Sequence, residues 1–326
     1  MTRLGYQIPN FTYPAVGPDA LFEAVARQVE AAEASGFDSV FLMDHFYQLP
    51  GLGTPDQYML ECYTTLAALA GRTRRVRLSA LVTGNTYRNP AMLAKIITTL
   101  DIVSGGRAQL GIGAGWFELE HDAYGFEFGT FTDRFEKLEE ALQIILPMLR
   151  SERPTLAGHH YTVTDAVNEP PPLSRIPIMI GGNGERKTLR MVAQYADEAN
   201  LTCGRDEIPR KVEALDRHCR RLGRPRAEIL LSHLTRVLIA PSVDEARNDL
   251  AGFLRLRGVN PTTLSEAERL DYESMFIFGD PDEVGRQMEE EMALGIEGFT
   301  FNMVANGHNP DRVALLGETA RRVLRM

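Results

Sequence analysis

Short apolar runs alternate with longer segments of helical periodicity along the chain, and this alternation limits the possible folds more than any other feature. The helical segments carry apolar residues three or four positions apart, as at Leu21, Val25, Val29 and Ala32. Strands that are separated by helices pair in parallel, and eight such units close into a barrel. We therefore predict an α/β fold, a (β/α)8 TIM barrel with insertions. The eight expected strands are Leu4 to Ile8, Ser39 to Met43, Val76 to Val82, Ala108 to Ile112, Ile176 to Ile180, Ala199 to Thr202, Ile229 to Ile239 and Gly298 to Met303.

The main alternative is a doubly wound parallel sheet, which normally carries a G-x-G-x-x-G motif after its first strand. Here the first strand runs into Pro9, Asn10 and Phe11 without a glycine pair. A single barrel accommodates all 326 residues, so we expect one domain, 1–326. Two insertions interrupt it. Residues 154–174 have the pattern of a hairpin and a stiff connector, and residues 258–278 that of an irregular excursion.

One helix has a distinctive pattern near both of its ends. Its apolar positions run from Phe135 to Leu149, and Asp133 with Glu136 resembles a capping box. Pro147 predicts a kink or an early stop.

The charge balance excludes one class of partner. With 35 Lys and Arg against 44 Asp and Glu, the net charge is −9, which opposes binding to nucleic acid.

The three cysteines, Cys62, Cys203 and Cys219, have no C-x-x-C spacing, which suits unpaired thiols in a reducing compartment. Since no apolar run reaches the roughly 18 residues of a membrane span and no signal-peptide pattern is present, we expect a cytoplasmic protein without a membrane partner.

A barrel of this kind holds its active site at the carboxyl ends of its strands. His45 follows the second strand and can give or take a proton near neutral pH, although a lone histidine is often structural. Asp44 beside it either fixes the turn or contacts a ligand. The other segments that follow strands are Thr83 to Arg88, Gly113 to Trp116 and Gly181 to Gly184.

The glycine clusters match no standard nucleotide motif. Gly181 to Gly184 nevertheless precedes a helix, and its backbone amides suit a phosphate, with Arg186 and Lys187 nearby. A tight turn is the alternative interpretation.

No histidine spacing predicts a metal site, and no G-x-S-x-G elbow predicts a serine hydrolase. His159 and His160 are expected to face solvent in the inserted hairpin. His233 is either a core residue or part of a pocket wall.

Several motifs in their order resemble the bacterial luciferase-like monooxygenase superfamily. Within it the chain is most similar to the branch that uses the 5-deazaflavin coenzyme F(420), with FMN as the alternative cofactor. The segments that carry the resemblance are Asp44-His45, Leu81 to Pro90, Ala94-Lys95, Thr99 to Asp101, Ser104 to Arg107, Gly111 to Trp116, Ile180 to Gly184, Tyr195 to Asp197 and Gly279 to Pro281.

The resemblance implies a barrel fold and roles for particular residues. The cofactor ring would lie against the end of the third strand, where relatives often hold a non-prolyl cis peptide, and His45 would act as proton donor or base. The implied cofactor-binding residues are Asp44, Ala80, Leu81, Thr83, Gly113, Ala114, Gly115, Trp116, Gly181, Gly182 and Asn183. Substrate contacts are expected from Asn10, Phe11, Tyr47 and Trp116.

The resemblance also implies a homodimer and an activity. We expect an oxidoreductase that transfers hydride between C5 of coenzyme F(420) and a small organic substrate. An FMNH2-dependent monooxygenase is one alternative, and a barrel that binds a cofactor without turnover is another. Trp116 stands where a dehydrogenase of this branch has a glutamate acid, which argues against a sugar-phosphate dehydrogenase.

Overall fold

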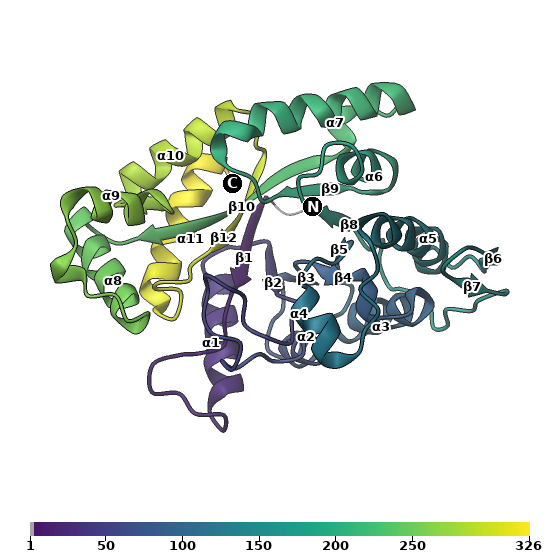
Figure 1. Cartoon of the computed structure of the whole chain (residues 1–326), viewed down its shortest axis with the longest axis horizontal. Helices are drawn as coiled ribbons and strands as arrows, with labels where there is room; N and C mark the ends of the chain where they lie inside the picture. Colours follow the sequence, from purple (N-terminus) through teal and green to yellow (C-terminus); the bar gives the residue numbers. More distant parts are fainter. Residues whose placement is uncertain (1–2) are drawn as a thin grey trace.

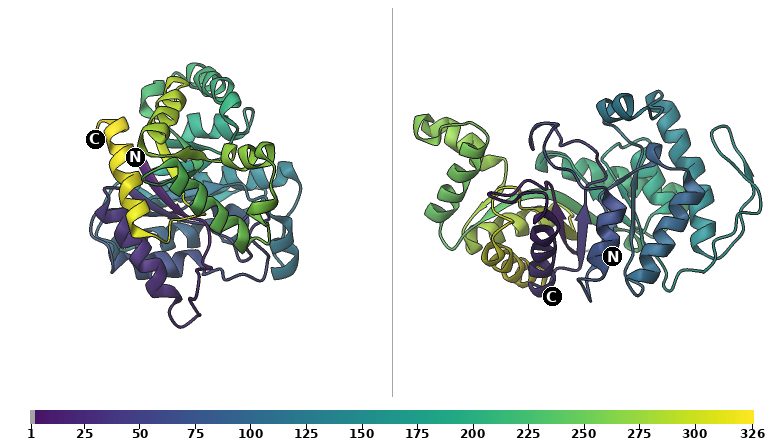
Figure 2. Two further views of the ribbon diagram at one scale, coloured as in Figure 1. Left: turned by 90° about the vertical axis from the view of Figure 1, so that its left-hand side faces the viewer. Right: turned by 90° about the horizontal axis from the view of Figure 1, so that it is seen from below.

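Parallel strands occupy the centre of the molecule and helices surround them (Figures 1 and 2). The computed structural model describes residues 3–326. The strands around the barrel are β1 (Leu4–Ile8), β2 (Ser39–Leu42), β3 (Arg77–Ala80), β4 (Thr83–Gly84), β5 (Leu110–Gly113), β8 (Ile178–Gly181), β9 (Glu198–Leu201), β10 (Leu230–Ile239) and β12 (Gly298–Asn302).

The strand order confirms the predicted barrel. Within the described residues the sheet runs β3-β2-β1-β12-β10-β9-β8-β5-β4, and a short strand outside this path, β11 (Ile277–Gly279), pairs with β10. All of these pairings are parallel. With β11 set aside and β3 and β4 counted as halves of one strand, eight barrel positions remain. An isolated parallel bridge between Leu78 and Ala108 closes the ring.

The third strand is interrupted, contrary to the continuous run expected from Val76 to Val82. β3 ends at Ala80, a non-prolyl cis peptide joins Leu81 to Val82, and β4 begins at Thr83. Apolar content alone cannot reveal such a break, because the apolar residues Ala80, Leu81 and Val82 run straight across it. The cis peptide lies where the family resemblance placed it.

Helices cover the outside of the barrel. The predicted apolar face of α1 is confirmed, since Leu21, Val25, Val29 and Ala32 are all buried in the main core. The helices are α1 (Leu21–Ala34), α2 (Cys62–Ala70), α3 (Pro90–Val103), α4 (Glu118–Tyr124), α5 (Phe131–Leu149), α6 (Thr188–Tyr195), α7 (Ile208–Leu222), α8 (Val243–Leu256), α9 (Glu266–Ser274), α10 (Pro281–Ala293) and α11 (Pro310–Leu324).

The start of α5 differs from the sequence prediction. Thr130 caps this helix and forms a capping box with Asp133, so the helix begins one turn before the predicted pair of Asp133 and Glu136. Pro147 lies inside the last turn, and α5 ends two residues later at Leu149.

Side chains alternate between the two sides of the barrel wall. Val40 and Leu42 pack outward in the main core, whereas Phe41 between them belongs to a small separate cluster. The barrel also buries a polar network. Its hydrogen bonds join Gln109 to Glu198, Glu198 to Ser232, Ser232 to Asn200 and Asn200 to Thr300.

The two predicted insertions lie at opposite edges of the view in Figure 1. The first contains the expected hairpin, with β6 (Leu156–Ala157) antiparallel to β7 (Thr162–Val163). The second is not irregular, because it contains α9 and β11. Ser265 and Glu268 form the capping box of α9, a signal present in the sequence. The outer half of β10 pairs with β11 and packs in a second, smaller core around Leu238.

Among residues 3–326, no helix combines the length and the apolar character needed to cross a bilayer.

Candidate active site

The ends of β2, β4, β5 and β8 converge at one side of the barrel. Asp44, after β2, accepts a hydrogen bond from the backbone N–H of Gly84 at 3.1 Å. Val82 lies between the other two strand ends, because a Cβ placed on Gly113 would be 2.8 Å from its Cγ2 and one on Gly181 would be 2.7 Å from its Cγ1. The side chain of Val82 therefore fits only because both neighbours are glycines. The sequence-predicted segments thus meet at one barrel mouth.

Val82 supplies the apolar surface of this mouth, a residue that the sequence analysis missed. Ala80 and Thr83, which it named, are fully buried, and Leu81 is nearly so. The hydroxyl of Thr83 is also engaged in a hydrogen bond with the Tyr63 hydroxyl. Val82 alone in this segment is half-buried. Below it lies the small cluster of Phe41, Leu81 and Met179, with Leu234 packed against it.

His45 is held through one ring nitrogen by a buried carboxylate. Its Nδ1 lies 2.9 Å from Oε2 of Glu120, which belongs to α4 and is fully buried. The same oxygen accepts a hydrogen bond from the Tyr87 hydroxyl at 2.6 Å. The other oxygen accepts the backbone N–H groups of Phe46 and Tyr47. Glu120 therefore fixes both the ring of His45 and the turn that carries it.

The charge of Glu120 determines where the hydrogen of His45 lies. Burial alone would raise the pKa of Glu120, but the hydrogen bond and charge of His45, with the bonds from Tyr87 and Tyr47, lower it overall. An ionised carboxylate only accepts hydrogen bonds, so Nδ1 of His45 carries a hydrogen. Nε2 is then the ring nitrogen left to exchange a proton with a reacting group, and none of the described residues forms a hydrogen bond with it.

Asp44 has a structural partner. Arg88 donates to both carboxylate oxygens, at 2.6 and 2.9 Å, and the Asp44 side chain is 1% exposed. Arg88 also bonds Glu61 and lies over the Tyr63 ring. These contacts favour the turn-fixing interpretation of Asp44, and a contact with a cofactor ring stays a prediction.

The two glycine loops lie beside two cations. Gly115 and Gly182 adopt φ values of +82° and +117°, which favour glycine. Arg134, from the first turn of α5, donates from Nε to the Gly115 carbonyl at 3.2 Å. The ammonium of Lys187 lies 5.3 Å from the Phe131 ring centroid, at the start of the same helix. Lys187 was predicted from the sequence and Arg134 was not.

The expected substrate residues differ in exposure. Trp116 is 59% exposed and its ring centroid lies 5.8 Å from that of His45, while Tyr47 and Asn10 are half-buried. Phe11 is fully buried in the main core. Its ring therefore offers no accessible surface in this conformation, and its substrate contact stays a prediction.

The remaining candidates lie elsewhere or serve the fold. His233 is a core residue, with Nδ1 2.7 Å from Glu291 and Nε2 3.0 Å from the Cys203 carbonyl. The three cysteines are unpaired, as expected.

Comparisons with known proteins identify the family of the chain. A family model described as luciferase-like monooxygenase matches residues 2–298. The F(420)-dependent glucose-6-phosphate dehydrogenase of Microbacterium testaceum is 30% identical over 319 residues, covering 92% of this chain and 91% of that protein. Pyrimidine monooxygenase RutA of Allorhizobium ampelinum is 29% identical over 266 residues, covering 75% and 69%.

A solved structure supports the fold. The coenzyme F(420) dependent tetrahydromethanopterin reductase from Methanopyrus kandleri has a TM-score of 0.77 at 19% identity, covering 98% of each chain. At this identity the likeness concerns the fold alone.

Proposed function

Because the chain belongs to the luciferase-like monooxygenase family, we propose that it is a coenzyme F(420)-dependent oxidoreductase acting on a small organic substrate. The observation that carries this proposal is the pairing of His45 with Glu120 at the barrel mouth, which leaves Nε2 of His45 open to a reacting group. The similarity to an F(420)-dependent dehydrogenase over nearly the whole chain supports the choice of cofactor.

The residues at the mouth suit a flat ring with a phosphate-bearing tail. Val82 and the apolar cluster beneath it offer a surface for a ring, and the close fit of Val82 between Gly113 and Gly181 holds that surface in place. The loops at Gly115 and Gly182 offer backbone groups to a phosphate, with Arg134 and Lys187 as cations nearby. When bound, the deazaflavin supplies a carbon, C5, that can give or accept a hydride.

The protein's own part in the reaction is to orient groups and to move a proton. Nε2 of His45 takes a proton from the substrate, or returns one, while Glu120 stabilises the charged imidazolium that results. Trp116 and Phe117 stack against each other beside His45, with ring centroids 5.1 Å apart. Their apolar faces reduce the access of water to the reacting atoms.

A monooxygenase that uses reduced FMN is the second candidate, favoured by the similarity to RutA. Both cofactors carry a tricyclic ring and a phosphate, so the mouth accommodates either chemistry. A measurement of which cofactor the protein binds distinguishes the two candidate functions.

Titration of the purified protein with each oxidised cofactor tests the proposal. We expect saturable binding of coenzyme F(420), followed by its absorbance or fluorescence, at concentrations where FMN does not bind. Tight binding of FMN without binding of the deazaflavin would contradict it and support the monooxygenase.

A His45→Ala variant separates an enzyme from a non-catalytic cofactor-binding barrel. With a screened electron-poor substrate, we expect turnover of reduced coenzyme to fall about 10²-fold or more, with cofactor affinity retained. Unchanged turnover in this variant would contradict the proton-transfer role of His45. Failure of every screened compound to oxidise the bound reduced cofactor would favour the non-catalytic barrel.

The family resemblance also supports the proposal of a homodimer, and the cysteine and hydropathy patterns support a cytoplasmic location. Sedimentation analysis tests the dimer directly, by distinguishing one 36.3 kDa chain from two. A single-chain mass at all concentrations would contradict it.

A further inference from the structure

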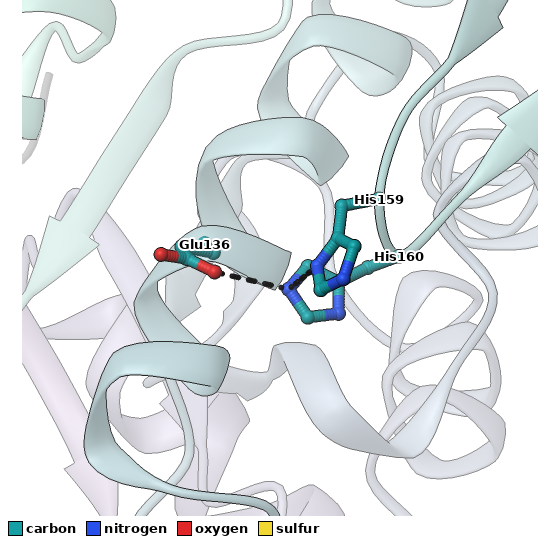
Figure 3. Close-up of side chains that lie close together, drawn as sticks. All are labelled: Glu136, His159 and His160. Carbon is teal, nitrogen blue, oxygen red and sulfur yellow. Dashed lines mark hydrogen bonds and ion pairs between the residues drawn. The ribbon is translucent and has the colours of Figure 1, made fainter.

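Three side chains with metal-binding atoms meet where the inserted hairpin contacts α5. Glu136 lies on α5, and His159 and His160 lie in the turn between β6 and β7 (Figure 3). Each offers one ligand atom, and these three atoms lie within 4.8 Å of one another. The sequence analysis expected both histidines to face solvent, but the His160 side chain is only 10% exposed.

Two of the three distances between these atoms match the edges of a zinc coordination tetrahedron, and the third is at most 4.8 Å. Nε2 of His160 lies 3.3 Å from Nδ1 of His159 and 3.4 Å from Oε2 of Glu136. Zinc bonds of about 2.0–2.1 Å to nitrogen or oxygen, at tetrahedral angles, place neighbouring ligand atoms about 3.3–3.4 Å apart. A single cation therefore already has two well-placed edges at His160, and His159 and Glu136 need only approach each other for it to bind all three atoms.

Hydrogen bonds alone satisfy this arrangement poorly. Nε2 of His160 faces both a carboxylate oxygen and a second imidazole nitrogen, yet a ring nitrogen carries at most one hydrogen. One hydrogen must then be shared between two acceptors, or one of the contacts lacks a hydrogen. A divalent cation accepts the lone pairs of all three atoms at once.

The hairpin turn is held in place independently of these three side chains. Glu140, one helical turn after Glu136, accepts the backbone N–H groups of His159, His160 and Tyr161 at 2.8 to 2.9 Å. A Cβ on Gly158 would lie 2.4 Å from Oε2 of Glu140, which explains the glycine at the start of the turn. The ligand set is thus preorganised by a carboxylate that is not itself a ligand.

The surrounding charge also favours a cation. The Glu140 carboxylate lies at this turn, where it accepts the backbone N–H groups of His159 and His160 at 2.8 and 2.9 Å. The nearby Lys137 is paired with Glu127 at 2.9 Å, which reduces its repulsion of a cation. Because Glu136 is 52% exposed and His159 is exposed, solvent reaches the group and can supply a fourth ligand.

We propose that Glu136, His159 and His160 bind one Zn²⁺, which fastens the inserted hairpin to α5. Two imidazoles and one carboxylate suit zinc better than Mg²⁺ or Ca²⁺, which prefer sets of oxygen ligands. The role is structural, since the metal would join two segments outside the barrel wall.

Zinc titration of the untagged full-length chain, stripped with a chelator and dialysed, tests the proposal. Competition with a chromogenic chelator gives the stoichiometry and affinity, and Co²⁺ in place of zinc gives a visible spectrum characteristic of tetrahedral coordination. We expect one equivalent of tightly bound zinc and no comparable binding of Mg²⁺. Each of Glu136→Gln, His159→Ala and His160→Ala should weaken zinc binding at least about 10-fold, since loss of a residue that merely supports a ligand has that effect.

Two exposed residues outside the group provide matched controls. Glu152→Gln and His308→Ala remove a carboxylate and an imidazole elsewhere on the surface, and both variants should bind zinc as the wild type does. Hydrogen exchange of residues 156–163 should slow on addition of zinc in the wild type and not in His160→Ala.

Two results would overturn the proposal. One is a wild-type chain that binds zinc no more tightly than the triple ligand variant. The other is tight one-equivalent binding that persists in all three single variants, which would place the metal elsewhere. Circular dichroism of the metal-free variants checks that folding is intact, and Glu136→Gln keeps the test valid if a histidine variant is unstable.

Discussion

Oε2 of Glu120 lies 2.9 Å from Nδ1 of His45, although 75 residues separate the two in the sequence. His45 follows β2, and Glu120 lies in the first turn of α4, after β5. The barrel brings these segments together because both follow the carboxyl ends of strands at one mouth. Through its two carboxylate oxygens, Glu120 connects the backbone of the loop after β2 to Nδ1 of His45.

Replacing Glu120 by glutamine should change the tautomer of His45. The NH₂ group of the glutamine side chain would face Nδ1 of His45. Because that group only donates, Nδ1 must accept its hydrogen bond, and the ring hydrogen moves to Nε2. We expect ¹⁵N NMR of the imidazole to show Nδ1–H in the wild type and Nε2–H in Glu120→Gln. Turnover should fall about 10²-fold or more, because Nε2 can no longer accept a proton.

The matched control for this change is Glu118→Gln, an exposed glutamate in the same turn of α4. It should leave both the tautomer and the turnover unchanged. An Nδ1–H tautomer that survives in Glu120→Gln would disprove the assigned role of the carboxylate.

The lowered pKa of Glu120 predicts a pH-dependent contribution to stability. A carboxyl with a lower pKa in the folded than in the unfolded state stabilises the fold fully above its ordinary value of 4.5. This contribution is lost as the pH falls through the folded-state value. The difference in unfolding free energy between wild type and Glu120→Gln should therefore be largest near neutral pH and shrink below about 4.5. Urea unfolding at a series of pH values measures it, and a difference independent of pH would contradict the prediction.

Adding a methyl group at Gly181 should displace Val82 into the mouth. The new Cβ would lie 2.7 Å from Cγ1 of Val82, too close for the side chain to stay in place. We expect Gly181→Ala to lower stability by about 1–3 kcal/mol and to weaken cofactor binding.

The double variant Gly181→Ala with Val82→Ala supplies the control for that prediction. Removing the Val82 methyl groups restores the space, so the double variant should be less destabilised than the sum of the single variants. Additive losses would show that the two side chains do not compete for space.

Loss of Arg88 should destabilise the protein strongly. Arg88→Met leaves the Asp44 carboxylate buried without a cation, which costs about 3–5 kcal/mol. A second change, Asp44→Asn, removes the stranded charge and should recover part of the loss. Chemical unfolding of the single and double variants measures both effects. Equal stability of Arg88→Met and the wild type would refute the importance of this ion pair.

The barrel and the position of its mouth could be predicted because both follow from periodic patterns. Apolar runs separated by helical segments imply parallel pairing, and parallel pairing places His45 and the glycine loops at one edge. The contacts that complete the site are of another kind. Glu120 and Arg134 look like ordinary surface residues of amphipathic helices, and only their long-range partners distinguish them.

Val82 was missed for a different reason. As the last residue of an apolar run it was assigned to the third strand, where alternation sets the direction of a side chain. The interruption between β3 and β4 cancels that alternation, so no pattern in the run predicts where Val82 points. The family resemblance located the cis peptide but did not identify the side chain that it presents.

The third strand and β5 are joined by few backbone hydrogen bonds, and this affects how the protein should respond to a ligand. Within residues 3–326, one bridge pairs Leu78 with Ala108, and β4 pairs with β5 at Thr83 and Gly84. Between these two points the Ser79 hydroxyl accepts the Gly111 N–H in place of a carbonyl. We therefore expect local opening of the barrel wall to begin between these two paired points, at Ser79 and Gly111. A ligand bound at the mouth should restrain this opening. Hydrogen exchange of the Gly111 amide should then slow more than that of the amides in the other strands.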